Sequence, residues 1–192
     1  GGKPAAQAGL DARAMIHAGL KGYVLVGGIE PDRDLAAEGA EAALQSADCV
    51  VALTPYASES LLRSAKVLLP TGTFAETAGT FVNIEGRWQS FLGAAQPVGQ
   101  SRPAWKVLRV LGTLLDLPGF EFSSVEEVRN ELLGALGTLE PDNTLAASRA
   151  LNGERPAGAV VDVPMYQVDA LVRRAPALQR TVDGQQPAVI YR

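Results

Sequence analysis

The sequence predicts an α/β fold in which βαβ units build a mainly parallel sheet, followed by a β-hairpin, two helices and an irregular tail. Two observations predict the sheet: short, wholly apolar runs recur up to Pro70, and segments of helix-forming composition separate them. Strands of a parallel sheet have this continuous apolar pattern because helices cover both faces. The third observation is a change after Pro70, where Thr, Gly and aromatic residues replace the apolar runs. With 192 residues, 47% of them hydrophobic, the chain can bury a substantial core.

Strands and helices alternate in the first part of the chain. Residues 32–45 are rich in Ala, Glu and Leu, which favour the helix. The expected order is helix 12–18, strand 22–26, helix 32–45, strand 49–53, helix 58–64 and strand 67–69. Strands that alternate with helices at this spacing indicate βαβ units and a parallel sheet.

The segment after Pro70 predicts a hairpin and then two helices. Residues 81–83 and 88–91 flank a turn in which Gly86 would supply a positive φ. Residues 103–115 begin with a proline and place apolar side chains at helical spacing, which predicts the first helix.

The second helix opens with a capping-box signature, in which Ser123 is the N-cap and Glu126 follows three residues later. It runs to about Leu136 and ends at Gly137. From Thr138 the pattern weakens, and we expect one strand over 159–163 and an extended arm over 164–192. We therefore divide the chain into an α/β domain, residues 1–137, and a C-terminal strand and tail, residues 138–192.

Composition excludes several classes of function. The net charge is -4, with 17 Lys and Arg against 21 Asp and Glu, so we expect no nucleic-acid partner. A single Cys49 and a single His17 cannot form a protein-only transition-metal site. Cys49 lies in an apolar strand, which indicates an inert core thiol, and His17 is expected at the surface or partly buried. No apolar stretch approaches the roughly 18 residues of a membrane span.

The turn after the first expected strand is where an open α/β sheet places a ligand. It begins with Gly27 and Gly28, but Glu30, Asp32 and Asp34 follow and would repel a pyrophosphate. We therefore favour a tight structural turn. The sequence leaves open whether the tail arginines, Arg173, Arg174 and Arg180, bind an acidic neighbour.

Glu76 and Glu85 are the other candidates, as a carboxylate pair for acid and base catalysis. We favour the alternative, in which Glu85 pairs with Arg87 or caps the turn. From the residues alone we predict an α/β module with no self-contained active site, and therefore no catalytic, cofactor-binding or metal-ligating residue in this chain.

A longer motif lies between Leu68 and Gln89. It resembles a segment of the molybdopterin oxidoreductase superfamily, in which an apolar strand ends in Leu-Pro and a block Glu-x-x-Gly-Thr-x-x-Asn-x-Glu-Gly-Arg-x-Gln follows. The block is complete in this sequence, with Glu76, Gly79, Thr80, Asn83, Glu85, Gly86, Arg87 and Gln89. We expect these residues to be structural, with Glu76, Glu85 and Arg87 forming a buried or half-buried polar knot.

Within that superfamily, residues 94–112, 117–120 and 125–129 resemble the molybdopterin-oxidoreductase-like subunit family of the proton-pumping bacterial NADH:quinone oxidoreductase, respiratory complex I. The resemblance covers roughly residues 10–136. Subunits of that family are much longer and begin with a cysteine-rich iron–sulfur region, so we expect this chain to be a C-terminal fragment.

The resemblance implies a non-catalytic scaffold in the peripheral arm of complex I, on the cytoplasmic side of the inner membrane and without membrane insertion. The parent complex would pass electrons from NADH through FMN and 2Fe-2S and 4Fe-4S clusters to quinone, with no cofactor in this chain. Pterin enzymes tend to carry Gly-x-Asn-Pro after the corresponding strand, and Glu30 stands here in place of the Asn.

Two alternatives stay open: a fragment of an active, formate dehydrogenase-like molybdopterin enzyme, and a free-standing ligand-binding α/β module. For the scaffold, the partners would be the rest of the subunit and other peripheral-arm subunits. We also expect the isolated fragment to self-associate through a face that includes Tyr56, Phe74, Trp88 and Phe91.

Overall fold

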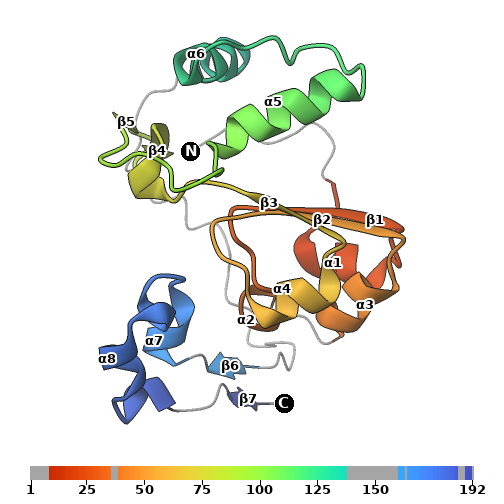
Figure 1. The fold of residues 1–192 in the computed structure, drawn as a ribbon, viewed down its shortest axis with the longest axis vertical. Helices are drawn as coiled ribbons and strands as arrows, with labels where there is room; N and C mark the ends of the chain where they lie inside the picture. The colour runs from red at the N-terminus through yellow and green to blue at the C-terminus, as the bar shows by residue number, and fades with distance from the viewer. Residues whose placement is uncertain (1–8, 36–38, 138–159, 163, 186–188, 192) are drawn as a thin grey trace, which may run out of the picture.

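The α/β class is confirmed by a computed structural model, which describes residues 9–35, 39–137 and 164–185 and the backbone of 160–162 and 189–191. The elements are α1 (Ala12–His17), β1 (Gly22–Val26), α2 (Pro31–Asp34), α3 (Ala40–Ser46), β2 (Cys49–Thr54), α4 (Glu59–Ser64), β3 (Val67–Pro70), η1 (Phe74–Glu76), β4 (Gly79–Val82), β5 (Trp88–Phe91), α5 (Ala104–Leu114), α6 (Val125–Leu136), β6 (Val160–Asp162), α7 (Met165–Val168), η2 (Val172–Arg174), α8 (Pro176–Gln179), η3 (Asp183–Gln185) and β7 (Val189–Tyr191) (Figure 1).

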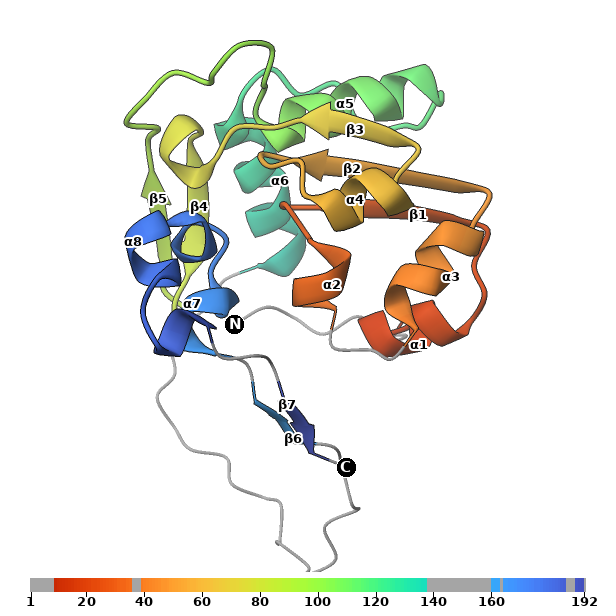
Figure 2. The ribbon, with the colours of Figure 1, turned by 60° about the horizontal axis from the view of Figure 1, so that its bottom comes forward.

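The predicted parallel sheet contains β1, β2 and β3 in that order, so β2 is central. Helices α1 to α4 lie on one side of it (Figures 1 and 2). The core forms between this face and the helices, where Leu44, Val50 and Leu61 are at most 1% exposed. The alternating strand residues Tyr23 and Leu25 of β1 complete it.

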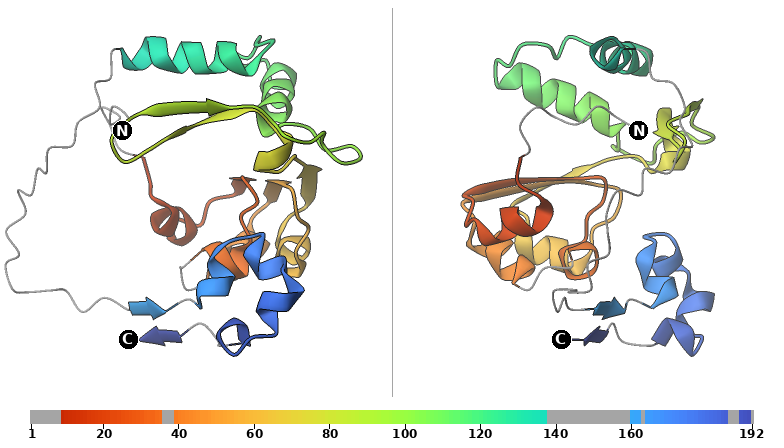
Figure 3. Two further views of the ribbon diagram at one scale, coloured as in Figure 1. Left: turned by 90° about the vertical axis from the view of Figure 1, so that its left-hand side faces the viewer. Right: turned by 180° about the vertical axis from the view of Figure 1, so that it is seen from behind.

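On the opposite side of the sheet lie the hairpin, α5 and α6 (Figures 1 and 3). This face is less completely covered: Val24 is 60% exposed, and Val26 and Val67 are also exposed. The predicted hairpin is confirmed, with β4 and β5 antiparallel and Gly86 at φ 84° in the connecting turn.

Two predicted helices differ in detail from the structure. The helix expected over 32–45 is interrupted, because α2 ends at Asp34 and Gly39 takes a left-handed conformation before α3. The helix α6 begins one residue later than expected, with Ser124 rather than Ser123 as N-cap. Ser123 instead donates its backbone N–H to Glu127, which lies one position after the expected Glu126. The predicted stop at Gly137 is confirmed.

The arm expected over 164–192 is not extended where the structure describes its side chains. Residues 164–185 fold into the short helices α7, η2, α8 and η3. These helices lie near the edge of the sheet that is formed by the carboxyl ends of its strands (Figure 2). Gln179 holds them together, since its amide donates to the carbonyls of Tyr166 and Val172. The backbone also shows β6 paired with β7, and the segment 138–159 lies outside the described residues. The division into residues 1–137 and 138–192 stays a prediction.

Candidate functional site

The turn that follows β1 is closed by hydrogen bonds within the chain. Gly27 and Gly28 have φ values of 92° and 79°, and both donate their backbone N–H groups to the carbonyl of Leu53 at 3.2 and 3.3 Å. A Cβ atom on Gly28 would lie 3.0 Å from Pro55, so the second glycine is also needed for space. The backbone amides of both glycines therefore extend the hydrogen bonding between β1 and β2 and are not free to bind a ligand.

Acidic side chains continue this turn. Glu30 is 5% exposed, and its backbone N–H donates to a carboxylate oxygen of Asp34 at 2.8 Å. Asp32 accepts a short hydrogen bond from the hydroxyl of Ser60 on α4. The turn thus places three carboxylates at the end of β1, as the sequence indicated.

Two arginines from η2 contact two of these carboxylates, those of Glu30 and Asp34. Arg174 Nη1 lies 2.7 Å from Glu30 Oε1, and Arg173 Nη1 lies 3.5 Å from the same oxygen. Arg173 Nη2 also donates to Asp34 Oδ1 at 2.6 Å. The side chains of Arg173 and Glu30 are each 6% exposed, whereas those of Arg174 and Asp34 are 30% and 29% exposed, so the centre of the cluster is buried and its edge is not. We call Glu30, Asp34, Arg173 and Arg174 the arginine cluster.

Tyr56, which follows β2, packs against the arginine cluster. The Arg174 guanidinium lies over its ring, 4.2 Å from the centroid, which is a cation–π geometry. Burial raises the pKa of the Tyr56 phenol, and the positive charge of Arg174 opposes that rise. Glu30, Arg173 and Arg174 line a cleft of about 580 Å³, to which Ser58, Ser60 and Arg63 also contribute.

The motif residues lie at the hairpin, at some distance from this cluster along the chain. Glu76 caps η1, accepting hydrogen bonds from the Thr73 backbone N–H at 2.7 Å and the Thr73 hydroxyl at 3.0 Å. These bonds hold the pKa of Glu76 below its ordinary value, the backbone bond contributing most. Arg87 instead pairs with Glu85 at 3.7 Å, with side chains 62% and 35% exposed.

The predicted polar knot is therefore wrong as a single cluster. Glu76 lies before β4 and Glu85 after it, and four strand residues at about 3.4 Å each keep the two carboxylates apart. The same separation gives no support to an acid–base pair. The favoured pairing of Glu85 with Arg87 is confirmed.

The other motif residues have local structural roles. Asn83 accepts the backbone N–H groups of Glu85 and Arg87 at 3.0 and 2.9 Å and so closes the hairpin turn. A Cβ atom on Gly79 would lie 2.8 Å from the ring of Phe91, which stacks on Phe81. Gln89 is exposed on β5.

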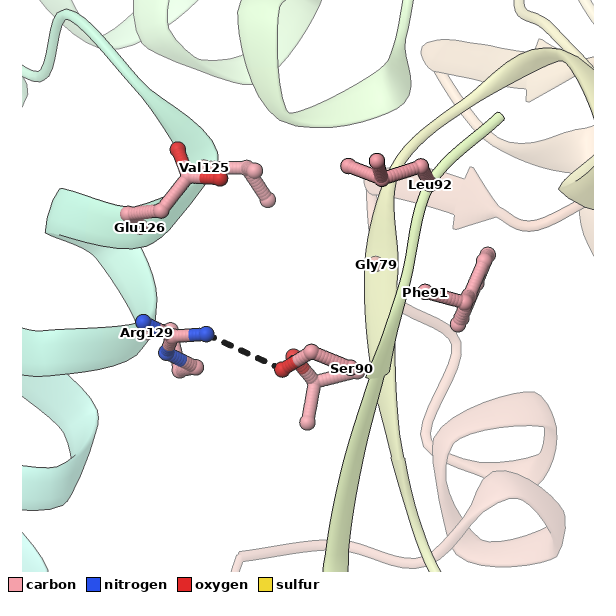
Figure 4. A pocket seen from close by; sticks show the side chains of 8 residues that line it. Gly79, Ser90, Phe91, Leu92, Val125, Glu126 and Arg129 are labelled. Carbon is pink, nitrogen blue, oxygen red and sulfur yellow. Dashed lines mark hydrogen bonds between the residues drawn. The ribbon is translucent and has the colours of Figure 1, made fainter. Parts of the chain in front are cut away.

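Figure 4 shows a small pocket between the hairpin and α6, with Val125, Glu126 and Arg129 on one side and Ser90, Phe91 and Leu92 on the other. Arg129 donates to the Ser90 hydroxyl at 3.0 Å, and that hydroxyl lies 3.0 Å from the hydroxyl of Thr80. The pocket has a volume of about 160 Å³. These contacts join the hairpin to α6 and indicate a packing contact between the two elements.

Cys49 and His17 lie outside both regions. Cys49 is exposed, so the expectation of a buried core thiol is wrong: it is the first residue of β2, and its side chain is not covered. His17 ends α1 and is exposed, as expected. Within the described ranges, no group of His, Cys, Asp and Glu side chains could hold a metal ion. Among those same residues, no helix has the length and apolarity that crossing a bilayer requires.

Comparison with known proteins identifies the family. Residues 5–114 match the Molybdopterin oxidoreductase family. The chain is 28% identical over 133 residues to the 78 kDa subunit of mitochondrial NADH-ubiquinone oxidoreductase from Candida albicans, and 30% identical over 129 residues to that of Neurospora crassa. These matches cover 62% and 60% of the chain but only 18% and 17% of the relatives.

A third relative is named for a different activity. The alpha subunit of the F420-dependent formate dehydrogenase of Methanocaldococcus jannaschii is 33% identical over 93 residues, which are 48% of the chain and 14% of that subunit. The chain thus spans less than a fifth of the length of each of these relatives. Because the family match covers more than half of its residues, the chain belongs to the molybdopterin oxidoreductase family.

Proposed function

We propose that this chain is a non-catalytic scaffold within a peripheral-arm subunit of an NADH:quinone oxidoreductase. Two of the relatives described above are NADH-ubiquinone oxidoreductase subunits, and the motif block that the chain shares with the superfamily serves the hairpin turn and its packing. The iron–sulfur clusters and FMN would belong to other parts of the complex. The chain would contribute surfaces that hold the subunit and its neighbours together.

The single observation that carries the proposal is the structure of the turn after β1. A pterin dinucleotide carries phosphates, which need free backbone amides or positive charge at such a turn. Here the backbone amides of Gly27 and Gly28 donate to the carbonyl of Leu53. Glu30 adds a carboxylate to the turn, and the nearby cations, Arg173 and Arg174, already form ion pairs with it. The residues present do not fit that cofactor.

The second candidate is part of an active, formate dehydrogenase-like enzyme. The observation that favours it is the 33% identity to the Methanocaldococcus subunit. In such an enzyme this chain would contribute to a cofactor cleft, so molybdenum or tungsten and a pterin would copurify with the full-length protein. A scaffold would copurify with iron and neither of these metals.

One experiment on the intact complex distinguishes the two. We expect Arg129→Ala, which removes the bond to Ser90, to lower the amount of assembled complex while leaving NADH oxidation per bound FMN unchanged. Arg13→Ala, on the exposed surface of α1, is the matched control and should leave assembly unchanged. Metal and pterin analysis of the same preparations should find neither molybdenum nor tungsten. Full assembly with reduced turnover, or a stoichiometric pterin, would contradict the scaffold.

A further inference from the structure

We infer that η2 is an intramolecular plug, in which Arg173 and Arg174 occupy the ligand-binding edge of the sheet and Glu30 anchors them. The inference does not depend on the proposed membership of complex I. Open α/β sheets bind ligands outside the carboxyl ends of their strands, and the arginine cluster lies at this edge, after β1 and β2.

The burial of the cluster separates it from an ordinary surface ion pair. Exposed pairs contribute little to stability, because solvent screens them and long side chains lose entropy. Arg173 and Glu30 are each 6% exposed, so the loss of one partner would leave the other charge buried. Removing one partner should therefore weaken the contact between the C-terminal helices and the sheet.

The backbone of the C-terminal helices orients the side chains of both arginines. Arg173 donates to the carbonyl of Val168 at 3.2 Å, and Arg174 donates to that of Ala170 at 2.9 Å. The backbone of the C-terminal helices thus presents both guanidinium groups toward β1. Tyr56 then receives Arg174 on its ring face, so the carboxylate and the aromatic ring act on the same guanidinium.

A second contact ties the same two segments together. Arg33 of α2 donates to the side-chain carbonyl of Gln167 on α7 at 3.4 Å. Gln167 in turn donates to Gln179 at 2.6 Å, so α2 is linked to the interior of the C-terminal helices. This hydrogen bond is exposed and long, so we expect it to contribute little to the contact between η2 and the sheet.

The ionic contacts differ in their geometry. Only the bond from Arg173 to Asp34 has hydrogen-bond geometry, whereas Glu30 Oε1 and Arg173 Nη1 are buried and have no hydrogen-bond partner. Glu30 therefore contacts the two arginines through its charge, without a hydrogen bond to its Oε1 atom. Neutralising Glu30 should release the plug more than the loss of any single hydrogen bond.

The test is hydrogen–deuterium exchange of the full-length protein, followed peptide by peptide. Glu30→Gln keeps the shape of the side chain and removes its charge. We expect exchange within 164–174 and within the turn 27–34 to rise by about a hundredfold, as for the opening of a buried ion pair. Exchange in the hairpin peptides, 79–91, should stay as in the wild type. The matched control is Glu59→Gln, whose carboxylate is 96% exposed and pairs with Arg63 at 3.9 Å, and it should change neither region.

A second variant keeps the inference testable if Glu30→Gln fails to fold. Arg174→Gln reaches the same contact from the C-terminal side, away from the sheet core, and should release 164–174 in the same way. Protection of 164–174 that is unchanged in Arg174→Gln would overturn the plug. An equal rise in all peptides, the hairpin included, would also overturn it, because the cluster would then serve global stability.

Discussion

Glu76 is the motif residue whose ionisation is coupled to a local structure. Its carboxylate accepts two hydrogen bonds from Thr73, and Thr73 in turn caps η1, so the charge and the cap form together. The folded protein favours the ionised form, because the pKa of Glu76 lies below its ordinary value of 4.5. A group with a lowered pKa stabilises the fold above the unfolded pKa and loses that contribution as pH falls through the folded pKa.

This coupling predicts the pH dependence of stability. Glu76→Gln should lower the thermal midpoint at pH 7, and the difference from the wild type should shrink steadily below pH 4.5. Thermal unfolding across this range measures the difference, with Glu59→Gln as the exposed control. If the gap between Glu76→Gln and the wild type is the same at both ends of the range, the carboxylate does not contribute through its ionisation.

Individual residues differ in how far the sequence predicts them. Gly86 and the pairing of Glu85 with Arg87 depend on neighbours in one turn, and both were predictable from the local pattern. The exposure of Cys49 was not predictable, because an apolar run indicates a buried strand but does not show which of its terminal residues are left uncovered by neighbouring elements. The sequence left open whether Arg173 binds an acidic neighbour. Its partner Asp34 is 139 positions away along the chain, and only the fold brings the two together.

Among the elements, α5 shows how a glycine can be required inside a helix. Glycine normally weakens a helix interior by roughly 0.5–1 kcal/mol relative to alanine. Gly112 of α5 is buried, and a Cβ atom there would overlap the ring of Phe120. The glycine lets the loop after α5 fold back onto the helix, since the Leu117 N–H also donates to the Gly112 carbonyl at 2.9 Å.

This packing predicts opposite effects at two helical glycines. Gly112→Ala should destabilise the protein by about 1–3 kcal/mol, because Phe120 must move out of its place. Gly134→Ala in α6 is the matched control: a Cβ atom there meets nothing within 4 Å, so the change should stabilise by about 0.5 kcal/mol or more. Urea unfolding of both variants measures the effects. Equal stabilisation by the two changes would show that Phe120 does not depend on Gly112.

Long, periodic elements were the most predictable ones. The apolar spacing predicted α5, and the capping signature predicted α6, each to within one residue at both ends. The apolar runs predicted all three strands of the parallel sheet. The prediction was wrong where backbone conformation overrides composition, as at Gly39, which separates α2 from α3 at φ 79°. It was also wrong for α7 and α8, which have four residues each and are organised by tertiary contacts of Gln167 and Gln179.

At the scale of the whole molecule, the sheet has one closed and one partly open face. Strands of a parallel sheet are normally covered on both sides. The exposed Val24 of β1 and Val67 of β3 are in register with Val51 between them, so the three valines form a row across the sheet. Of the four aromatic residues expected on an open face, only Phe74 is exposed, at 60%. Exposed apolar side chains therefore lie on both elements: Val24 and Val67 on the sheet, and Phe81, Ile84 and Leu92 on or next to the hairpin.

This open row predicts self-association of the isolated chain through the sheet. Val24→Lys places a charge at the most exposed valine of the row, so it should shift the mass in sedimentation velocity toward the monomer. The fold should tolerate it, because a side chain that is 60% exposed can carry its charge into solvent. The matched control is Leu62→Lys, which changes an equally exposed apolar residue, at 62%, on α4 and outside the sheet. Self-association that Leu62→Lys reduces as much as Val24→Lys would mean that general charge, and not the open sheet face, governs the contact.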